Sequence, residues 1–577
     1  MKITTTKEKQ RLEHFRALFE NARCAYSEEL DKLEQNMRQY RGSDEIDGSS
    51  ERASTVRNIT YEIVESQISS DIPSPKADPA SYSEKRERAA HSIERLCRCL
   101  RDRLPFGELN DIDERYTYIY GGSVWFVEWD NSLKLGREVG GVKVHCLSPT
   151  SFIPQPKVYS VDDMEYCFLR FTTTRAELVR KYGVSEEESY LAECVHENGS
   201  FDTGDSVSII LAFFKGDDGS VGQFVFSGEL VLSDIENYYS RKVRICRICG
   251  MREELCSCED PKFTTEDEKF EFLPPEFGSG KQVPYYLPRH FPIVVRKNTS
   301  GENSLLGQSD CEYLRPEQQA INKIETRILQ KLLRAGVTPI VPEDASISIN
   351  NSVFGQVIKM KPGETTAQYG KVDTTPDISQ DIAEAERLYD HAKRTLGISD
   401  AFQGISESAN ESGYARQLRI NQASGRLLSK KKMKGFAYAS IDRLIFEHYL
   451  AFADEPRSLS YKDCFGRIHD ECFNRYDFLV FDAEKGEYYY EDTFIFSSDL
   501  SAGTEFGREE LWQRNLENLK SGTLGDPAAN ATLLRYWQAQ ERAHYPGARE
   551  NVEYFLELTL KGGCDTANGE IHNYQAI

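Results

Sequence analysis

The sequence lacks an apolar run long enough to cross a membrane. No stretch approaches about 18 consecutive apolar residues. Residues 1–4 (MKIT) open the chain without the apolar core and cleavage site of a secretory signal. We therefore expect a protein with no membrane partner, held in a reducing compartment. Most of its 14 cysteines are then expected to be buried thiols or metal ligands, because disulfides are rare there.

The sequence also lacks the motifs of the common enzyme classes. Its ten histidines form no H-E-x-x-H pair, and no G-x-S-x-G elbow is present. Gly278-Ser279-Gly280-Lys281 suggests a phosphate loop, but that loop needs glycine where Pro275 stands and Ser or Thr where Gln282 stands. Adjacent carboxylates such as Asp162-Asp163 are expected to be solvated. We therefore expect a protein without catalytic activity.

Basic residues are too few to balance the acids. Lys and Arg total 71 against 93 Asp and Glu, which gives a formal net charge of -22. Such a chain is not expected to wrap nucleic acid over its whole surface, because phosphate binding needs clustered Lys and Arg. The negative charge either keeps the protein soluble or lines a surface along which DNA slides without adhering. We favour the first interpretation. A chain of 577 residues suggests about three or four domains.

Hydrophobic periodicity predicts an α+β first half. The predicted helices cover 6–41, 52–69 and 83–104. The predicted strands cover 116–129, as a pair turning at Gly121-Gly122, then 142–146, 206–214 and 221–226. The last two flank Gly216-Asp217-Asp218-Gly219, which is typical of a hairpin. A proline-punctuated link is expected at 149–156.

The second half predicts two helices joined by a small β insert. The first begins near Pro316, carries Ile321, Ile324, Ile328 and Leu332 at helical spacing, and ends at Ala335-Gly336. The second covers 378–396 and ends at Gly397, so the two are expected to form an antiparallel pair. A polar loop at 399–412 leads to a long helix at 413–453. The remaining predictions are strands at 477–481 and 488–496 and helices at 509–519 and 531–542.

In this order the parts resemble portal proteins of tailed bacteriophages. Three stretches carry the likeness together with the helix, β insert, helix, loop and long helix: 58–68 (NITYEIVESQI), 120–129 (YGGSVWFVEW), and 305–310 (LLGQSD) leading to 318–323 (QQAINK). The likeness covers about 41–496, and the terminal helices fit the family only loosely.

The resemblance implies a multi-domain α+β ring subunit. Residues 1–304, with the long helix and returning strands of 413–502, are similar to a wing that carries a cysteine-rich insert at about 240–260. Residues 305–336 and 378–398 resemble stem helices, and 337–377 resemble an α/β clip. Residues 399–412 resemble a tunnel loop, and 503–577 a helical crown with a C-terminal tail.

The resemblance also implies the partners and the place of work. Portals act as closed rings of about twelve copies at the capsid vertex, in the virion and, during assembly, in the host cytoplasm. The implied partners are further copies, the terminase large subunit, a head-completion or adaptor protein, the major capsid and scaffolding proteins, and double-stranded DNA bound without sequence preference. Two other functions stay open: a zinc-containing nucleic-acid enzyme, and a monomeric adaptor or binding module.

The tunnel loop that the resemblance implies is polar and poor in cations. We expect it to face DNA in the channel and to touch it without gripping. Its candidate residues are Asp400, Phe402, Gln403, Gly404, Ser406, Glu407, Ser408 and Asn410.

A basic stretch follows, with seven cations and no acid between 413 and 434: Arg416, Arg419, Arg426, Lys430, Lys431, Lys432 and Lys434. It forms either a contact face for DNA or an acidic partner, or pairs with carboxylates of a neighbouring subunit. We favour the pairing.

Four cysteines have the spacing of a metal site. Cys246 and Cys249 form a C-x2-C-G turn, and Cys256 and Cys258 supply a second pair seven residues later. Zinc takes four such thiolates in a tetrahedron, which leaves no open position for a substrate. We therefore predict a structural zinc ion that braces this loop. The alternative is four reduced thiols without a metal.

Overall fold

The computed structural model describes most of the chain. The described residues are 6–43, 55–135, 138–194, 206–240, 242–248, 258, 263–267, 270–273, 281–302, 304–334, 337–340, 349–350, 357–358, 370–373, 376–398, 425–462, 468–482, 486–499, 505–542 and positions 545, 547–548, 551–552 and 554–555. Helices and antiparallel sheets alternate along the chain, which confirms the α+β class.

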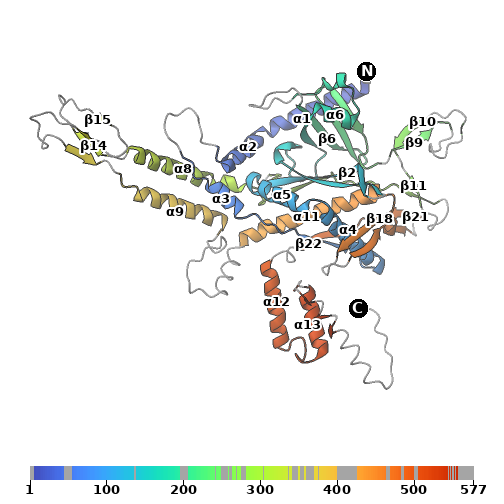
Figure 1. Ribbon diagram of the computed structural model, residues 1–577. Coiled ribbons are helices and arrows are strands. Elements are labelled where there is room, and N and C mark those ends of the chain that lie inside the picture. Colours follow the sequence, from blue (N-terminus) through green and yellow to red (C-terminus); the bar gives the residue numbers. More distant parts are fainter. Residues whose placement is uncertain are drawn as a thin grey trace, which may run out of the picture.

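The helices divide between a body, a projecting pair and a terminal pair (Figure 1). Their bounds are α1 (Thr6–Ala25), α2 (Ser27–Arg41), α3 (Ile59–Glu65), α4 (Glu84–Arg103), α5 (Phe106–Tyr120), α6 (Arg175–Tyr182), α7 (Glu186–Ser189), α8 (Asp310–Arg334), α9 (Ser379–Leu396), α11 (Gly425–Phe452), α12 (Glu505–Lys520) and α13 (Asn530–Arg542).

The strands form two larger sheets and several two-stranded pairs. The five-stranded sheet runs β4 (Phe152–Pro154), β5 (Tyr166–Thr174), β6 (Ser206–Lys215), β7 (Val221–Ser227) and β8 (Leu230–Ile235). The three-stranded sheet runs β13 (Ile293–Lys297), β2 (Gly122–Leu135) and β3 (Glu138–Leu147).

The two-stranded pairs are β1 (Ser74–Pro79) with β22 (Phe494–Asp499), β9 (Lys242–Cys246) with β10 (Phe263–Asp267), β11 (Phe270–Phe272) with β12 (Gln282–Pro284), β14 (Val337–Ile340) with β17 (Gly370–Asp373), β15 (Ile349–Asn350) with β16 (Val357–Ile358), β18 (Arg457–Lys462) with β19 (Ile468–Phe473), and β20 (Leu479–Asp482) with β21 (Glu487–Tyr490).

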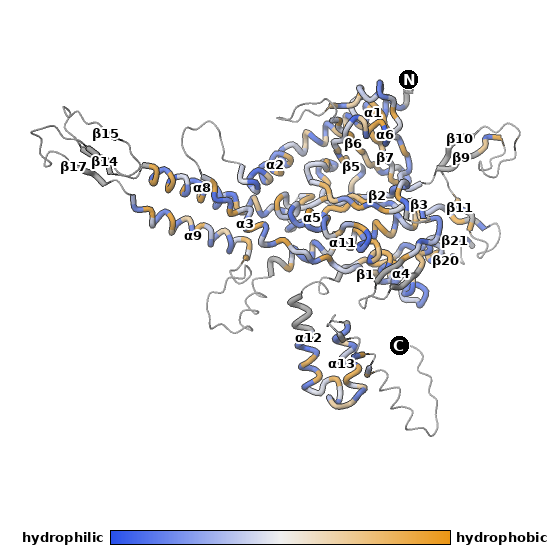
Figure 2. The backbone as a smooth tube through the Cα atoms, in the orientation of Figure 1, coloured by the Kyte–Doolittle hydropathy of each residue, from blue (hydrophilic) through white to orange (hydrophobic). Residues whose placement is uncertain are grey.

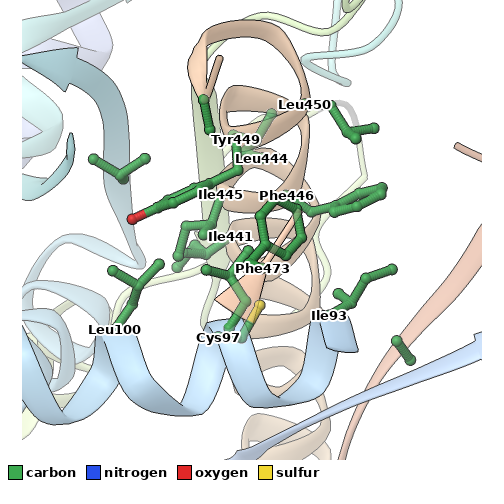
Figure 3. Close-up of a cluster of buried hydrophobic side chains, with 14 of the residues drawn as sticks. Ile93, Cys97, Leu100, Ile441, Leu444, Ile445, Phe446, Tyr449, Leu450 and Phe473 are labelled. Carbon is green, nitrogen blue, oxygen red and sulfur yellow. The ribbon is translucent and has the colours of Figure 1, made fainter. Parts of the chain in front are cut away.

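The largest core forms around α11. Side chains of α11 meet those of α4 and of β19, as Figure 3 shows for Ile93, Cys97, Ile445, Phe446 and Phe473. The second half of α11 is buried on nearly every side, so other elements enclose this part of the helix. This core joins segments more than 350 residues apart in the sequence, so α11 holds the body together.

The five-stranded sheet is buried on both faces. Along β6, Ile209, Leu211 and Phe213 face one core, whereas Ile210 and Ala212 face another, because successive side chains of a strand point to opposite faces. Helix α1 covers the second face with Phe15 and Phe19.

The stretch 116–129 was predicted as a strand pair, and this prediction is wrong in its first half. Residues up to Tyr120 belong to α5, and only β2 follows the glycines. Gly121 ends α5 with φ of +86°, and a Cβ there would lie 2.3 Å from the carbonyl oxygen of Gly307. Gly121 is therefore needed because it ends helix α5 and because the backbone of Gly307 passes close to it. It does not form a hairpin turn.

Most other predicted elements are confirmed within a few residues. The helix predicted over 6–41 is α1 followed by α2, and that over 83–104 is α4. The helix predicted over 52–69 is wrong in length, because within the described residues 55–69 only α3 is helical, and the chain enters it at the cap Asn58. Strand β1 was not predicted, since it contains Pro75 and Pro79; its only partner is β22, and prolines are tolerated on such edge strands.

Helices α8 and α9 form an antiparallel pair that projects from the body, hereafter the α8–α9 hairpin (Figure 1). Helix α8 begins at Asp310, so the prediction of a start near Pro316 was too late. Strands β14 and β17 pair at the far end, where a small β insert was predicted. Polar and apolar residues alternate along both helices (Figure 2).

Candidate functional site

The base of the α8–α9 hairpin is anchored by apolar packing. Leu314 and Ile321 of α8 meet Leu396 of α9, and α3 inserts Ile59 and Ile63 between them. All five side chains are buried. The short helix α3 therefore fixes the angle at which the hairpin leaves the body.

Ion pairs hold the two helices together further along. Asp381 of α9 accepts hydrogen bonds from Arg327 and Lys331 of α8. The bond from Lys331, with the charge of Arg327, lowers the pKa of this carboxyl. Nearer the body, Arg57 lies 2.9 Å from Glu386 of α9 and 3.8 Å from Glu325 of α8. The cations of these pairs are at least one-third exposed, so each pair contributes little to stability, but together they align α8 with α9.

The apolar stripe predicted on α8 turns outward towards the tip. Ile321 is fully buried and Ile328 is 8 % exposed, whereas Leu332 is 49 % and Leu333 is 66 % exposed. Near the start of α9, Ile382 is 46 % exposed. Several exposed aliphatic side chains at one end of a projecting helix pair suit burial by another chain.

A buried ionic network lies where α8 begins. The Lys430 ammonium of α11 is 2.6 Å from an Asp310 carboxylate oxygen and 3.0 Å from the Gln67 amide oxygen. Asn298 donates to the other oxygen of Asp310 over 2.9 Å. Asp310 is 1 % exposed and Lys430 is 5 % exposed. The network joins α8 to α11 and to the strand-end residue Asn298.

A second buried network lies beside the first. Lys434 lies 3.1 Å from Glu114 of α5, and Arg296 of β13 lies 2.7 Å from the same carboxylate. Burial alone would raise the pKa of Glu114, but Arg296 and Lys434 lower it to about 2. Burial lowers the pKa of Lys434, although Glu114 opposes the shift. Arg296 also pairs with Asp113, so the two buried carboxylates of α5, Asp113 and Glu114, both have cationic partners.

These networks correct the predicted contact face on the basic stretch. Lys430 and Lys434 lie inside the body and pair with carboxylates of their own chain. A neighbouring subunit is not needed for that pairing. Lys431 is half-buried and Lys432 is exposed, so the described part of the face reduces to these two. Arg416, Arg419 and the side chain of Arg426 lie outside the described residues.

The sequence patterns did not identify Asp310, Glu114 or Arg296 as members of these networks. An acidic residue at the first position of a helix usually complements the helix dipole, which is how Asp310 would be interpreted. Nothing local pairs it with a lysine 120 residues later.

The predicted tunnel loop lies outside the described residues. This applies to Asp400, Phe402, Gln403, Gly404, Ser406, Glu407, Ser408 and Asn410. The point where the chain enters the loop is described: Gly397 ends α9 with φ of +78°, and Ile398 is buried against the base of the hairpin. The role of the loop stays a prediction.

Two of the four predicted zinc ligands are described, and they lie close together. Strands β9 and β10 pair so that Cys246 faces Phe263, and the Cys246 Sγ lies 3.9 Å from the Cys258 Sγ. Two thiolates on one tetrahedral zinc, each with a bond of about 2.3 Å, are separated by about 3.8 Å. The two sulfurs therefore fit a shared zinc ion. Cys249 and Cys256 lie outside the described residues.

Within the described ranges, no cluster of three or more His, Cys, Asp or Glu side chains is arranged to hold a metal ion. Among the same residues, no helix has the length and apolar character needed to cross a membrane.

No protein-family model matches the chain, and no curated protein matches it.

Proposed function

We propose that the protein is the subunit of a portal-type ring that guides double-stranded DNA into and out of the capsid of a tailed bacteriophage. The observation that carries this proposal is the α8–α9 hairpin. It projects from an α+β body, bears a small strand pair at its tip, and is followed in the chain by the buried helix α11 (Figure 1).

In this proposal each part has one task. The body, including residues 1–304 and 413–502, is the wing. The hairpin is the stem, residues 337–377 are the clip that meets the terminase large subunit and later a head-completion protein, and residues 399–412 are the tunnel loop. Residues 503–577, which contain the α12–α13 pair, are the crown. The protein has no catalysis of its own, and the motor that packages DNA is a separate protein.

The exposed end of the stem supports assembly with neighbouring copies in a closed ring, for which the resemblance to portal proteins implies about twelve copies. Leu332, Leu333 and Ile382 lie on the hairpin with about half or more of each side chain exposed. Neighbouring stems in a ring would bury them, and burying one such side chain contributes about 1.5–3 kcal/mol. The buried networks around Asp310 and Glu114 would hold every stem at the same angle, which a closed ring requires.

Two further features fit the proposal. The β9–β10 pair lies on the side of the body opposite the hairpin (Figure 1), so a zinc ion there would brace the wing without entering the stem. When bound, zinc would supply a structural link between Cys246 and Cys258. We also propose that the protein works in the virion and, during assembly, in the host cytoplasm, alongside the major capsid and scaffolding proteins.

The proposal is tested by native mass and by electron microscopy of the purified protein. We expect closed rings with rotational symmetry. Leu333→Asp should shift the population towards monomers, because it places a charge in the proposed interface. Leu191→Asp is the matched control, since Leu191 is 54 % exposed but lies in the body.

Two results would contradict the proposal. One is a monodisperse monomer at micromolar concentration under several salt conditions. The other is a ring population that Leu333→Asp leaves unchanged, because the stem would then not be the interface.

A further inference from the structure

A polar cavity of about 130 Å³ lies between α2, α8 and the residues that lead into α3. Its walls carry five amide side chains and a single charged side chain. These residues are Gln35, Gln39, Arg315, Gln318, Gln319 and Asn322. The guanidinium of Arg315 is therefore the one charged group among the described residues that line the cavity, and no carboxylate lines it.

Arg315 differs from the buried cations elsewhere in the chain. Its Nη2 donates to the Asn36 amide oxygen over 2.5 Å, and its Nε donates to the Gln39 amide oxygen over 3.2 Å. Both acceptors are neutral. Within the described part of the chain no carboxylate pairs with Arg315, whereas Arg296 pairs with Asp113 and Glu114, and Lys430 pairs with Asp310. A guanidinium held by neutral acceptors keeps the ability to bind an anion.

The amides that line the cavity are held in fixed orientations. Gln318 accepts from the backbone and hydroxyl of Thr60 and donates to the Arg57 carbonyl. It also donates to the Asn322 amide oxygen over 2.8 Å. Because that oxygen of Asn322 already accepts a bond, its NH2 group is left to donate to another acceptor. The wall therefore offers a cation and at least one oriented neutral donor.

We propose that this cavity binds a single carboxylate group. One guanidinium balances one negative charge and can donate two parallel hydrogen bonds to the two oxygens of a carboxylate. A phosphate dianion would remain half neutralised in a site that is otherwise uncharged. A volume of about 130 Å³ corresponds to roughly four water molecules, which suits a small carboxylate or the end of an acidic side chain.

The carboxylate has two sources with the same chemistry: a free small acid, or an acidic side chain of a second copy of this chain. The test uses sodium acetate against sodium chloride at equal ionic strength. Unfolding temperature reports binding, and native mass reports whether acetate changes the assembled fraction.

We expect acetate to raise the unfolding temperature of the wild-type protein by about 2 °C when its concentration is about 100 times the dissociation constant. Arg315→Gln should remove the response to acetate. The control Arg38→Gln should keep it, because Arg38 is exposed on α2 and does not line the cavity.

A second variant keeps Arg315 in place and so guards against misfolding. Gln319→Glu puts a carboxylate at the cavity rim, four residues after Arg315 on the same helix, where the two side chains are neighbours. We expect it to occupy the guanidinium, to raise the unfolding temperature in chloride, and to abolish the response to acetate.

The native mass then identifies the source. A fall in the assembled fraction with acetate, seen in wild type and absent in Gln319→Glu, indicates a side chain of a second copy. An unchanged assembled fraction indicates a free acid. The proposal is overturned if acetate and chloride stabilise the wild-type protein equally, or if Arg315→Gln and Gln319→Glu respond to acetate as the wild type does. The unfolding temperature can be measured on a monomer, so a failure of ring formation does not decide whether the cavity binds a carboxylate; the native mass serves only to identify the source of the carboxylate.

Discussion

His448 should make the core around α11 sensitive to acid. It lies on α11 with no exposed surface, and its ring packs 5.2 Å from that of Tyr239. Its Nδ1 is 2.7 Å from the Leu444 carbonyl oxygen, so this nitrogen carries the proton and donates. Nε2 has no hydrogen-bond partner among the described residues. Burial therefore lowers the pKa of His448 from 6.5 to about 4.

The sign of the effect follows from proton binding. Between about pH 6.5 and pH 4 the unfolded chain binds a proton at His448 and the folded chain does not. The free energy of unfolding therefore falls as the pH falls through this range, and the loss is complete below about pH 4. A difference of about 2.5 pKa units at about 1.36 kcal/mol each gives roughly 3 kcal/mol.

The matched variant is His448→Phe, which removes the titrating group and keeps an aromatic ring beside Tyr239. The Leu444 carbonyl retains its bond to the backbone N–H of residue 448 within the helix. Hydrogen exchange of peptides from α11 measures the opening free energy of this part alone, which suits a chain too large to unfold in a single step.

We expect the opening free energies of wild type and His448→Phe to be similar at pH 7 to within the cost of fitting the larger ring. Between pH 6.5 and 4 the wild type should lose about 3 kcal/mol more than the variant. Parallel pH dependence of the two proteins, within about 0.5 kcal/mol, would refute the assignment of a buried neutral histidine.

Three further predictions concern the hairpin base, a close backbone approach and the cysteines. Lys430→Met leaves Asp310 buried without its cation and should lower the opening free energy of peptides from α8, measured by hydrogen exchange, by about 3–5 kcal/mol, whereas Lys432→Met at the surface should change it by less than about 0.5 kcal/mol. Gly121→Ala should lower the unfolding temperature far more than Gly183→Ala: both glycines have positive φ, but only at Gly121 does the new Cβ meet backbone. Metal analysis should find about one zinc per chain, lost in Cys246→Ser; unchanged zinc content in that variant would remove Cys246 from the site.

Local patterns were enough to predict the elements whose buried side is apolar. Helix α4 buries Ile93, Leu96 and Leu100, which recur at spacings of three and four, and the prediction over 83–104 is confirmed. The β6–β7 hairpin was predicted from two strand-like segments and from the glycines that flank Asp217-Asp218 between them, because a tight turn and its strands are encoded by neighbouring residues.

The same reasoning failed where the buried side is polar. Helix α5 was not predicted, because Asp113, Glu114 and Thr117 occupy its inner face, where helical periodicity predicts apolar residues. Their burial is possible only because Arg296 arrives from β13, more than 180 residues later in the chain. A pattern in one segment cannot contain that partner.

The composition and periodicity of this sequence thus determined an α+β chain with an antiparallel helix pair and a small β insert between its helices. The tertiary structure alone decided that Lys430 and Lys434 point inward, and that the apolar stripe of α8 is buried at its base and exposed at its tip. The physical reason is the same in both cases. Burying a charge requires an opposite charge, and exposing an apolar stripe requires the absence of a covering element, and both depend on residues distant in the sequence.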